Sequence, residues 1–220
     1  MRLSFLLFSV IMGTTAWGAT LIGNIGAFAN GSNNVFGATA TTVGFSVNAG
    51  TNYDLTAALF TLNNTNTFTI PASNLNVGLF ADGGGKPAGN ALVTFTVGGN
   101  IGIGDATYTA TPNSPFQLDA STTYWLILND PSDSLLFWQS TATTPTGGGA
   151  SFAGSSQGNM TSPTQVGSFG PGNINAPLLF EIDGTPSVTG QTPEPGTLLL
   201  TACGVCGLMF LRRRLSRFHL

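Results

Sequence analysis

The middle of the chain alternates apolar and polar residues with the period of two that is typical of β-strands. The clearest case is residues 91–97, which read Ala-Leu-Val-Thr-Phe-Thr-Val, and the most strongly apolar one is residues 122–129. No apolar period near 3.6 is sustained between Gly23 and Asp183, so the pattern predicts little helix. Further strands are predicted at 37–47, 55–62, 75–81, 105–111, 135–140 and 178–183.

These eight short strands are separated by glycine-rich turns, such as residues 82–87 and 98–100. Such spacing predicts an all-β domain built as a two-sheet antiparallel sandwich with jelly-roll-like connections. The longest stretch without alternation is 141–176, which is mostly Ser, Thr, Gly, Asn and Pro. We expect a flexible or Ω-like loop there, over one end of the sandwich, with a binding loop as the alternative.

The N-terminal apolar run has a different pattern. Arg2 precedes an apolar segment at 3–12, and small residues follow at Ala16 and Gly18. This order is typical of a secretory signal peptide. We predict a signal peptide at 1–18, removed by signal peptidase after Gly18, with cleavage after Ala19 as the alternative.

The C-terminal run, residues 197–211, has no charge and is followed by Arg212, Arg213, Arg214 and Arg217. As a helix it would span about 22 Å, less than the roughly 30 Å hydrocarbon core of a bilayer. Arginine stems can extend an apolar segment, and an arginine cluster is held in the cytoplasm. The run therefore predicts one short transmembrane helix with a cytoplasmic stop, and an exported chain before it.

Two prolines flank a glutamate just before this helix, at Pro193, Glu194 and Pro195. They hold the peptide extended, as a protease requires of its substrate. The order of this tripeptide, a short apolar helix and an arginine cluster resembles the PEP-CTERM sorting signal of Gram-negative bacteria. The resemblance implies cleavage at or near the motif by an exosortase, a membrane-embedded cysteine transpeptidase. A plain single-span anchor with a proline-rich turn is the alternative.

The predicted organisation is a signal peptide at 1–18, a domain at 19–185, a linker at 186–192 and a sorting signal at 193–220. Without its two ends the chain keeps one base, Lys86, against eight acids, a net charge of −7. Such a surface repels phosphates, so nucleic-acid binding is excluded. The domain also has no histidine or cysteine, which excludes Ser-His-Asp and Cys-His nucleophiles and histidine zinc sites.

The carboxylates remain as candidate chemistry. Asp130 and Asp133 lie in a predicted turn, and Glu181 alternates with Asp183 on the last predicted strand. Paired carboxylates could serve a glycosidase, and an acidic loop could hold calcium. Neither pattern is specific, so we predict a protein that is not an enzyme and has no catalytic residue, cofactor or metal.

Short aromatic motifs give a second resemblance. Tyr124-Trp125-Leu126-Ile127-Leu128, together with Tyr53-Asp54-Leu55, Val77 to Asp82 and Phe137-Trp138, is similar to choice-of-anchor ectodomains, most of all to type R. That family implies a β-sandwich joined to an interchangeable anchor, and it implies no established activity.

The expected function is that of an exported surface or matrix protein, anchored in the inner membrane as a precursor and then delivered to the cell surface or extracellular matrix. The PEP-CTERM resemblance implies an association with exopolysaccharide in biofilm or floc. A carbohydrate-binding module is the alternative, with Trp138 stacking on a sugar beside Gln139; burial of Trp125 and Trp138 in the core opposes it. A glycan-active enzyme is the third possibility.

Overall fold

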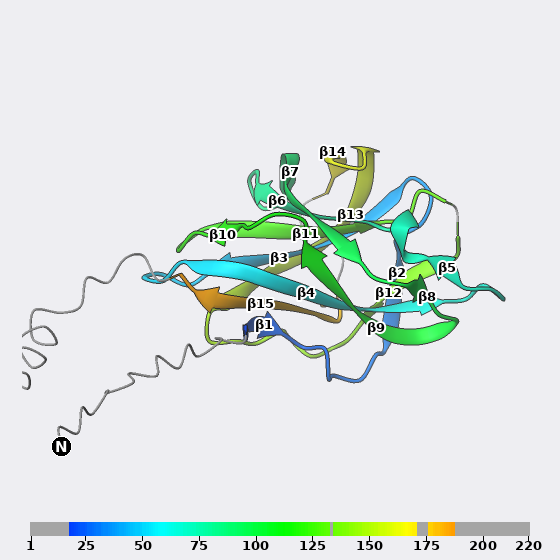
Figure 1. Cartoon of the computed structure of the whole chain (residues 1–220), viewed down its shortest axis with the longest axis horizontal. Coiled ribbons are helices and arrows are strands. Elements are labelled where there is room, and N and C mark those ends of the chain that lie inside the picture. Colours follow the sequence, from blue (N-terminus) through cyan, green and yellow to red (C-terminus); the bar gives the residue numbers. More distant parts are fainter. Residues whose placement is uncertain (1–17, 133, 171–175, 188–220) are drawn as a thin grey trace, which may run out of the picture. The chain divides into compact units, whose positions relative to one another are not determined.

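The computed structural model describes residues 18–132, 134–170 and 176–187, which form an all-β domain (Figure 1). Its strands are β1 (Ala19–Gly23), β2 (Gly31–Asn34), β3 (Thr39–Val47), β4 (Tyr53–Asn64), β5 (Ile70–Pro71), β6 (Asn76–Asp82), β7 (Pro87–Val97), β8 (Asn100–Ile101), β9 (Gly104–Pro112), β10 (Gln117–Leu118), β11 (Thr123–Asn129), β12 (Leu136–Ser140), β13 (Ala150–Ser162), β14 (Gln165–Phe169) and β15 (Phe180–Pro186). The only helix in these ranges is the short 3-10 turn η1 (Ala72–Asn74).

Every predicted strand overlaps an observed one, which confirms the all-β class with large antiparallel sheets. The prediction of a loop at 141–176 is wrong. This stretch contains β13, which has 13 residues, and β14, with which it pairs. Its small side chains allow close packing: a Cβ on Gly158 would lie 2.3 Å from the Ser168 carbonyl oxygen.

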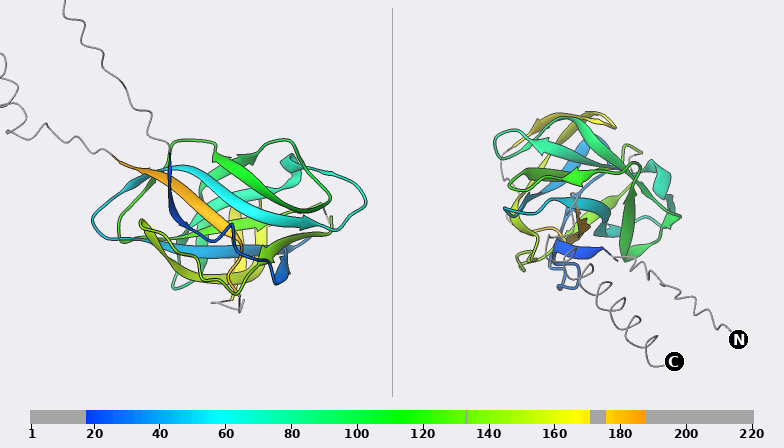
Figure 2. Two further views of the ribbon diagram at one scale, coloured as in Figure 1. Left: turned by 90° about the horizontal axis from the view of Figure 1, so that it is seen from below. Right: turned by 60° about the vertical axis from the view of Figure 1, so that its left-hand side comes forward.

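One layer of the domain is organised around the long strand β4. This strand pairs with β15 and β9 along its length and with β10 and β12 at its two ends. The short strand β1 lies beyond β15, and β2 pairs with β12. All these pairs are antiparallel, and Figure 2 shows β4 (cyan) beside β15 (orange).

The second layer has the order β13-β3-β11-β6. Strand β7 joins the two layers, because it pairs with β6 on one side and with β9 of the first layer on the other. The strands thus form one continuous sheet that folds over itself, which the local alternation of residues could not reveal.

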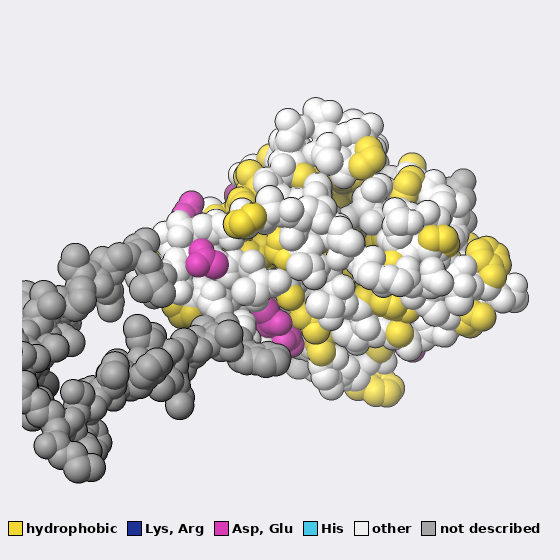
Figure 3. All heavy atoms as spheres, viewed as in Figure 1, with side chains coloured by type: hydrophobic (Ala, Val, Ile, Leu, Met, Phe, Trp, Pro, Cys, Tyr) yellow, Lys and Arg dark blue, Asp and Glu magenta, His cyan; other side chains and the backbone are white. Residues whose placement is uncertain are grey.

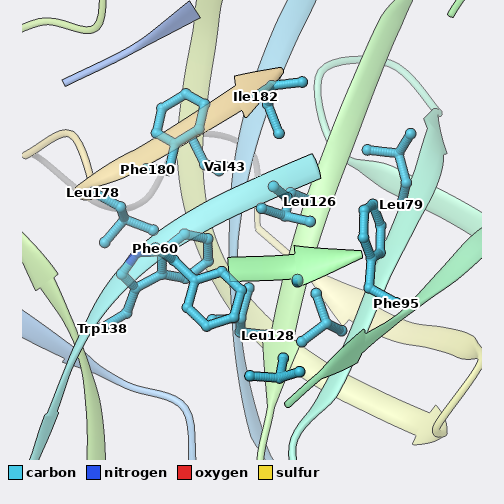
Figure 4. Close-up of a cluster of buried hydrophobic side chains, with 14 of the residues drawn as sticks. Val43, Phe60, Leu79, Phe95, Leu126, Leu128, Trp138, Leu178, Phe180 and Ile182 are labelled. Atoms are coloured by element: carbon cyan, nitrogen blue, oxygen red, sulfur yellow. The ribbon is translucent and has the colours of Figure 1, made fainter. Parts of the chain in front are cut away.

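The main hydrophobic core lies between the two layers (Figure 4). Phe60, Trp138 and Ile182 come from the first layer, whereas Val43 and Leu126 come from the second. All five side chains are buried. Burying one large apolar side chain contributes about 1.5–3 kcal/mol, so this sandwich-like core is the main source of stability.

A second, smaller core lies on the other face of β11. It contains Ala40, Phe80, Trp125, Ile127 and Phe169. Strands β7, β14, β13, β3, β11 and β6 pair in turn, and β6 pairs again with β7, so the sheet closes into a ring around these residues. Strand β11 is therefore buried on both faces, with Tyr124 in the main core and Trp125 in the small one.

The predicted glycine turns occur where expected. Gly84 and Gly85 both have a φ of +81°, between β6 and β7, and Gly99 has a φ of +75°. The Asp82 carboxylate accepts hydrogen bonds from the amides of Gly84 and Gly85, at 3.1 and 3.0 Å. Only glycine adopts these angles without strain, so the turns fix where β7 begins.

Most of the predicted signal peptide, most of the linker and the whole sorting signal lie outside the described residues. Among residues 18–132, 134–170 and 176–187, no helix has the length and apolar character needed to cross a membrane.

Candidate functional site

The two ends of the described domain lie on neighbouring strands. β1 begins at the predicted mature N-terminus, and β15 ends at Pro186, where the predicted linker begins. Strand β1 lies beside β15 (Figure 1), with Ala19 paired with Gly184 and Thr20 with Asp183. The pairing is antiparallel, so the segments before Ala19 and after Pro186 leave from the same end of the domain.

Of the predicted cleavage and sorting residues, the structure describes only Gly18. This residue lies just before β1. The motif residues Pro193, Glu194 and Pro195, the helix at 197–211 and the cytoplasmic arginines Arg212, Arg213, Arg214 and Arg217 lie outside the described residues.

Trp138 is not available to stack on a sugar, so its assignment as a carbohydrate contact is wrong. Its side chain is 0% exposed, and its Nε1 donates a hydrogen bond of 2.8 Å to the Leu179 carbonyl oxygen. Its ring packs edge-on against Phe60, with centroids 6.0 Å apart. The opposing expectation, that Trp125 and Trp138 fill the core, is confirmed.

Tyr124 and Trp125 point to opposite faces of β11, as the alternation predicts, but neither is exposed. The Trp125 Nε1 donates a hydrogen bond of 2.8 Å to the Asp82 carboxylate at the rim of the small core. Burial would raise the pKa of Asp82, but this bond and those from the Gly85 and Gly84 amides outweigh it and lower the pKa. The Asp82 carboxylate thus accepts hydrogen bonds both from the Trp125 indole and from the Gly84 and Gly85 amides of the turn.

Asp130 is buried, and its side chain bonds to residues of the turn that follows it. Its carboxylate accepts hydrogen bonds from the Ser132 amide at 2.9 Å, from the Ser132 hydroxyl at 2.5 Å and from the Ser134 hydroxyl. Asp133, its proposed partner, lies outside the described residues. Within the described ranges, no three acidic, histidine or cysteine side chains lie close enough to hold one metal ion.

Glu181 and Asp183 do form a pair, on the outer face of β15. The Thr20 hydroxyl donates to Glu181 Oε1 at 2.8 Å. Burial, the Glu181 charge and a hydrogen bond with Glu181 outweigh the opposing effect of the Thr20 hydroxyl and raise the pKa of Asp183 to about 6. The charge on each of these two carboxyls therefore disfavours ionisation of the other.

The raised pKa makes Asp183 sensitive to pH. An acid with a raised folded-state pKa stabilises the fold only while it holds its proton. That contribution is complete below the ordinary pKa of 3.8 and is lost as the pH rises through about 6. At neutral pH an ionised Asp183 therefore opposes folding unless a cation reaches it.

A groove that the sequence did not predict crosses the other layer. A hollow of about 310 Å³ lies between η1, β6 and β7 on one side and the β13–β14 turn on the other. A second hollow of about 190 Å³ adjoins it and shares Asn76 and Pro163. Pro163 and Thr164 form one wall. They belong to residues 141–176, whose composition predicts a loop, so no pattern in the sequence predicts the groove.

The lining of this groove is uncharged and mixes apolar side chains with hydroxyl and amide groups. Hydroxyls come from residues such as Thr94 and Thr164. The amides of Asn76 and Asn129 donate within the protein, Asn76 Nδ2 to Asn129 Oδ1 and Asn129 Nδ2 to backbone carbonyl oxygens. Apolar side chains, among them Val77, line the rest. Such a surface can donate and accept hydrogen bonds and can cover the C–H faces of a ligand, and it offers no charge to an ionic one.

No protein-family model and no curated protein sequence matches this chain.

Proposed function

We propose that this chain is an exported, non-enzymatic surface or matrix protein of a Gram-negative bacterium. In this account the secretion machinery exports it, signal peptidase removes residues 1–18, the helix at 197–211 holds the precursor in the inner membrane, and an exosortase cuts near Pro193. The all-β domain is then a jelly-roll-like sandwich ectodomain delivered to the surface or to an exopolysaccharide matrix. The order of motif, apolar run and arginines supports this reading most strongly.

The arrangement of the domain ends is compatible with such an anchor. The pairing of β1 with β15 lets both processed segments leave from one end of the domain. The ten residues between Pro186 and the predicted helix at 197–211 span at most about 40 Å when fully extended. The precursor domain would therefore remain tethered to the bilayer until cleavage releases it.

The sorting reading predicts the effect of a Pro193→Ala, Glu194→Ala, Pro195→Ala variant. In a host that carries an exosortase, the variant is expected to stay in the inner membrane at its uncut mass, because its C-terminal peptide is no longer held extended. Membrane fractionation and intact mass measure this directly. Thr189→Ala, in the same part of the chain but outside the motif, is the control and should be processed like the wild type. Normal delivery of the triple variant would refute the sorting reading.

The groove favours carbohydrate binding as a second candidate function, in place of the site at Trp138. An uncharged polyol ligand matches its hydroxyls and apolar walls, and its size suits a small ligand or a short stretch of a polymer. The sugar units of a secreted polysaccharide are polyols of this kind. This function and the surface role can hold together.

Filling the groove tests the second function. Thr164→Trp places an indole in it, and we expect retention on the host's secreted polysaccharide to fall by about tenfold, the loss of roughly 1.4 kcal/mol of binding. Thr109→Trp adds the same side chain at an exposed position of β9 outside the groove and should bind as the wild type does. Equal retention of both variants in a pull-down would exclude the groove as the binding site.

A further inference from the structure

Two buried oxygen atoms on neighbouring strands lack a hydrogen-bond partner. They are Asp183 Oδ1 on β15 and Thr56 Oγ1 on β4; in the described part of the chain only Ser155 Oγ shares this condition. Asp183 pairs with Ala57, the residue next to Thr56, at the point where the register between the two strands shifts. The two orphan acceptors thus lie at one irregularity of the sheet. A buried acceptor without a donor is costly, and a carboxylate is the costlier one.

The chain just before β1 covers this place. Ala19 pairs with Gly184 on β15, but Gly18 reaches past β15 to Thr56 on β4. The approach is close: a Cβ on Gly18 would lie 2.3 Å from Thr56 Oγ1. The Gly18–Ala19 peptide bond, where cleavage is predicted, therefore passes over β15 at Gly184, the neighbour of Asp183 in the chain.

No cation reaches this place in the described structure. On β15 the other titratable group is Glu181, which adds negative charge. Strand β4 carries Tyr53 and Asp54, and the Asp54 Oδ1 accepts a hydrogen bond from the Ser187 hydroxyl; β1 carries no titratable side chain. Lys86, the one base of the described residues, lies in the turn between β6 and β7, and neither of those strands pairs with β1, β4 or β15. Figure 3 shows acidic side chains over β1 and β15.

We propose that Asp183 and Thr56 are the binding site for the α-ammonium group of Ala19, which cleavage of the precursor creates. The inference rests on the proposed export. Hydrolysis adds water across the Gly18–Ala19 peptide bond: Gly18 leaves with a carboxylate, and the Ala19 nitrogen keeps its proton and gains two to become an ammonium group. Removal of Gly18 uncovers Thr56 Oγ1. Two of the three ammonium N–H groups then donate to Asp183 Oδ1 and Thr56 Oγ1, and both orphan acceptors are satisfied.

Cleavage would then add an ion pair between β1 and β15 that the precursor lacks. The pKa of Asp183 falls in the mature chain, because the ammonium group favours the carboxylate, and the pKa of the α-amino group rises. The pH dependence of the folding stability that Asp183 contributes therefore changes sign. In the mature chain the stabilisation is present at neutral pH and is lost when the pH falls far enough to protonate Asp183, or rises far enough to deprotonate the amine.

The reactivity of the α-amino group tests this contact. Mature protein from an exporting host is acylated with isotope-coded acetic anhydride at pH 7, and Lys86 serves as an internal reference. An ion pair that raises the amine pKa by one unit lowers its free-base fraction about tenfold. We therefore expect Ala19 in the wild type to react about tenfold more slowly than in Asp183→Asn. Asp105→Asn, which removes a charge from β9 at the far end of β4, should react like the wild type.

Each outcome decides between the two claims. A mature chain whose amine reacts equally in the wild type and in Asp183→Asn overturns the ion pair and leaves export standing. An amine in the wild type with the reactivity of an unstructured peptide overturns it as well, whether or not the variant folds. A recovered chain that still begins at Met1 overturns both the ion pair and the proposed export, and Edman sequencing identifies that case.

Discussion

Replacing Trp138 by alanine is expected to lower the free energy of unfolding by about 3–5 kcal/mol, the range for removing a buried aromatic side chain. The side chain is fully buried between the layers and fills the space beside Phe60. Its loss leaves a cavity there and also removes the donor to the Leu179 carbonyl oxygen. Urea unfolding of the mature protein, followed by circular dichroism, measures the change.

The control for this variant is Phe28→Ala. Phe28 is 87% exposed, so removing its ring should change the unfolding free energy by no more than about 0.5 kcal/mol. A Trp138→Ala variant as stable as Phe28→Ala would contradict the buried position of the indole and would reopen its assignment as a surface contact.

Replacing Trp125 by alanine should have a similarly large effect, about 3–5 kcal/mol, through a different core. Trp125 is 1% exposed and is the largest side chain of the small core inside the ring of strands. Its ring occupies the space above Gly44, where a Cβ would lie 2.8 Å from it. The Trp125→Ala variant therefore leaves a cavity at the centre of the ring of strands. Urea unfolding again measures the loss of unfolding free energy.

Trp125→Phe separates packing from the hydrogen bond. It keeps an aromatic ring in the small core but removes the indole donor to Asp82. We expect the pKa of Asp82 to rise in this variant, since that bond is the largest of the effects that lower it. NMR titration of the carboxyl measures it. An unchanged pKa would show that the indole does not bind this carboxylate in solution.

The strands that sequence reasoning found are those whose apolar residues alternate, because the period of two is a local property. It missed β13, whose residues are mostly Gly, Ser, Ala and Asn. That strand is held by its pairing with β3 from Ala150 to Asn159, and by close packing that needs small residues, as at Gly158. Composition alone makes such a segment look like a loop.

The aromatic residues illustrate a second limit. Alternation correctly predicts that Tyr124 and Trp125 face opposite sides of β11, yet it cannot tell that both sides are buried. That depends on β6, β7 and β14 closing the sheet into a ring, and the contacts that do so join residues far apart in the chain. Alternation also predicts that Glu181 and Asp183 share one face of their strand. Their proximity to Thr20 and to Thr56, like the groove beside Pro163, comes from contacts between distant parts of the chain that no local pattern predicts.

The intact mass of the protein recovered from outside the inner membrane of a Gram-negative host with an exosortase tests the central claim most directly. The account predicts a chain that begins at Ala19 and ends at or near Pro193, without the apolar run and the arginines. A full-length chain from Met1 to Leu220, found only in the cytosol, would contradict it.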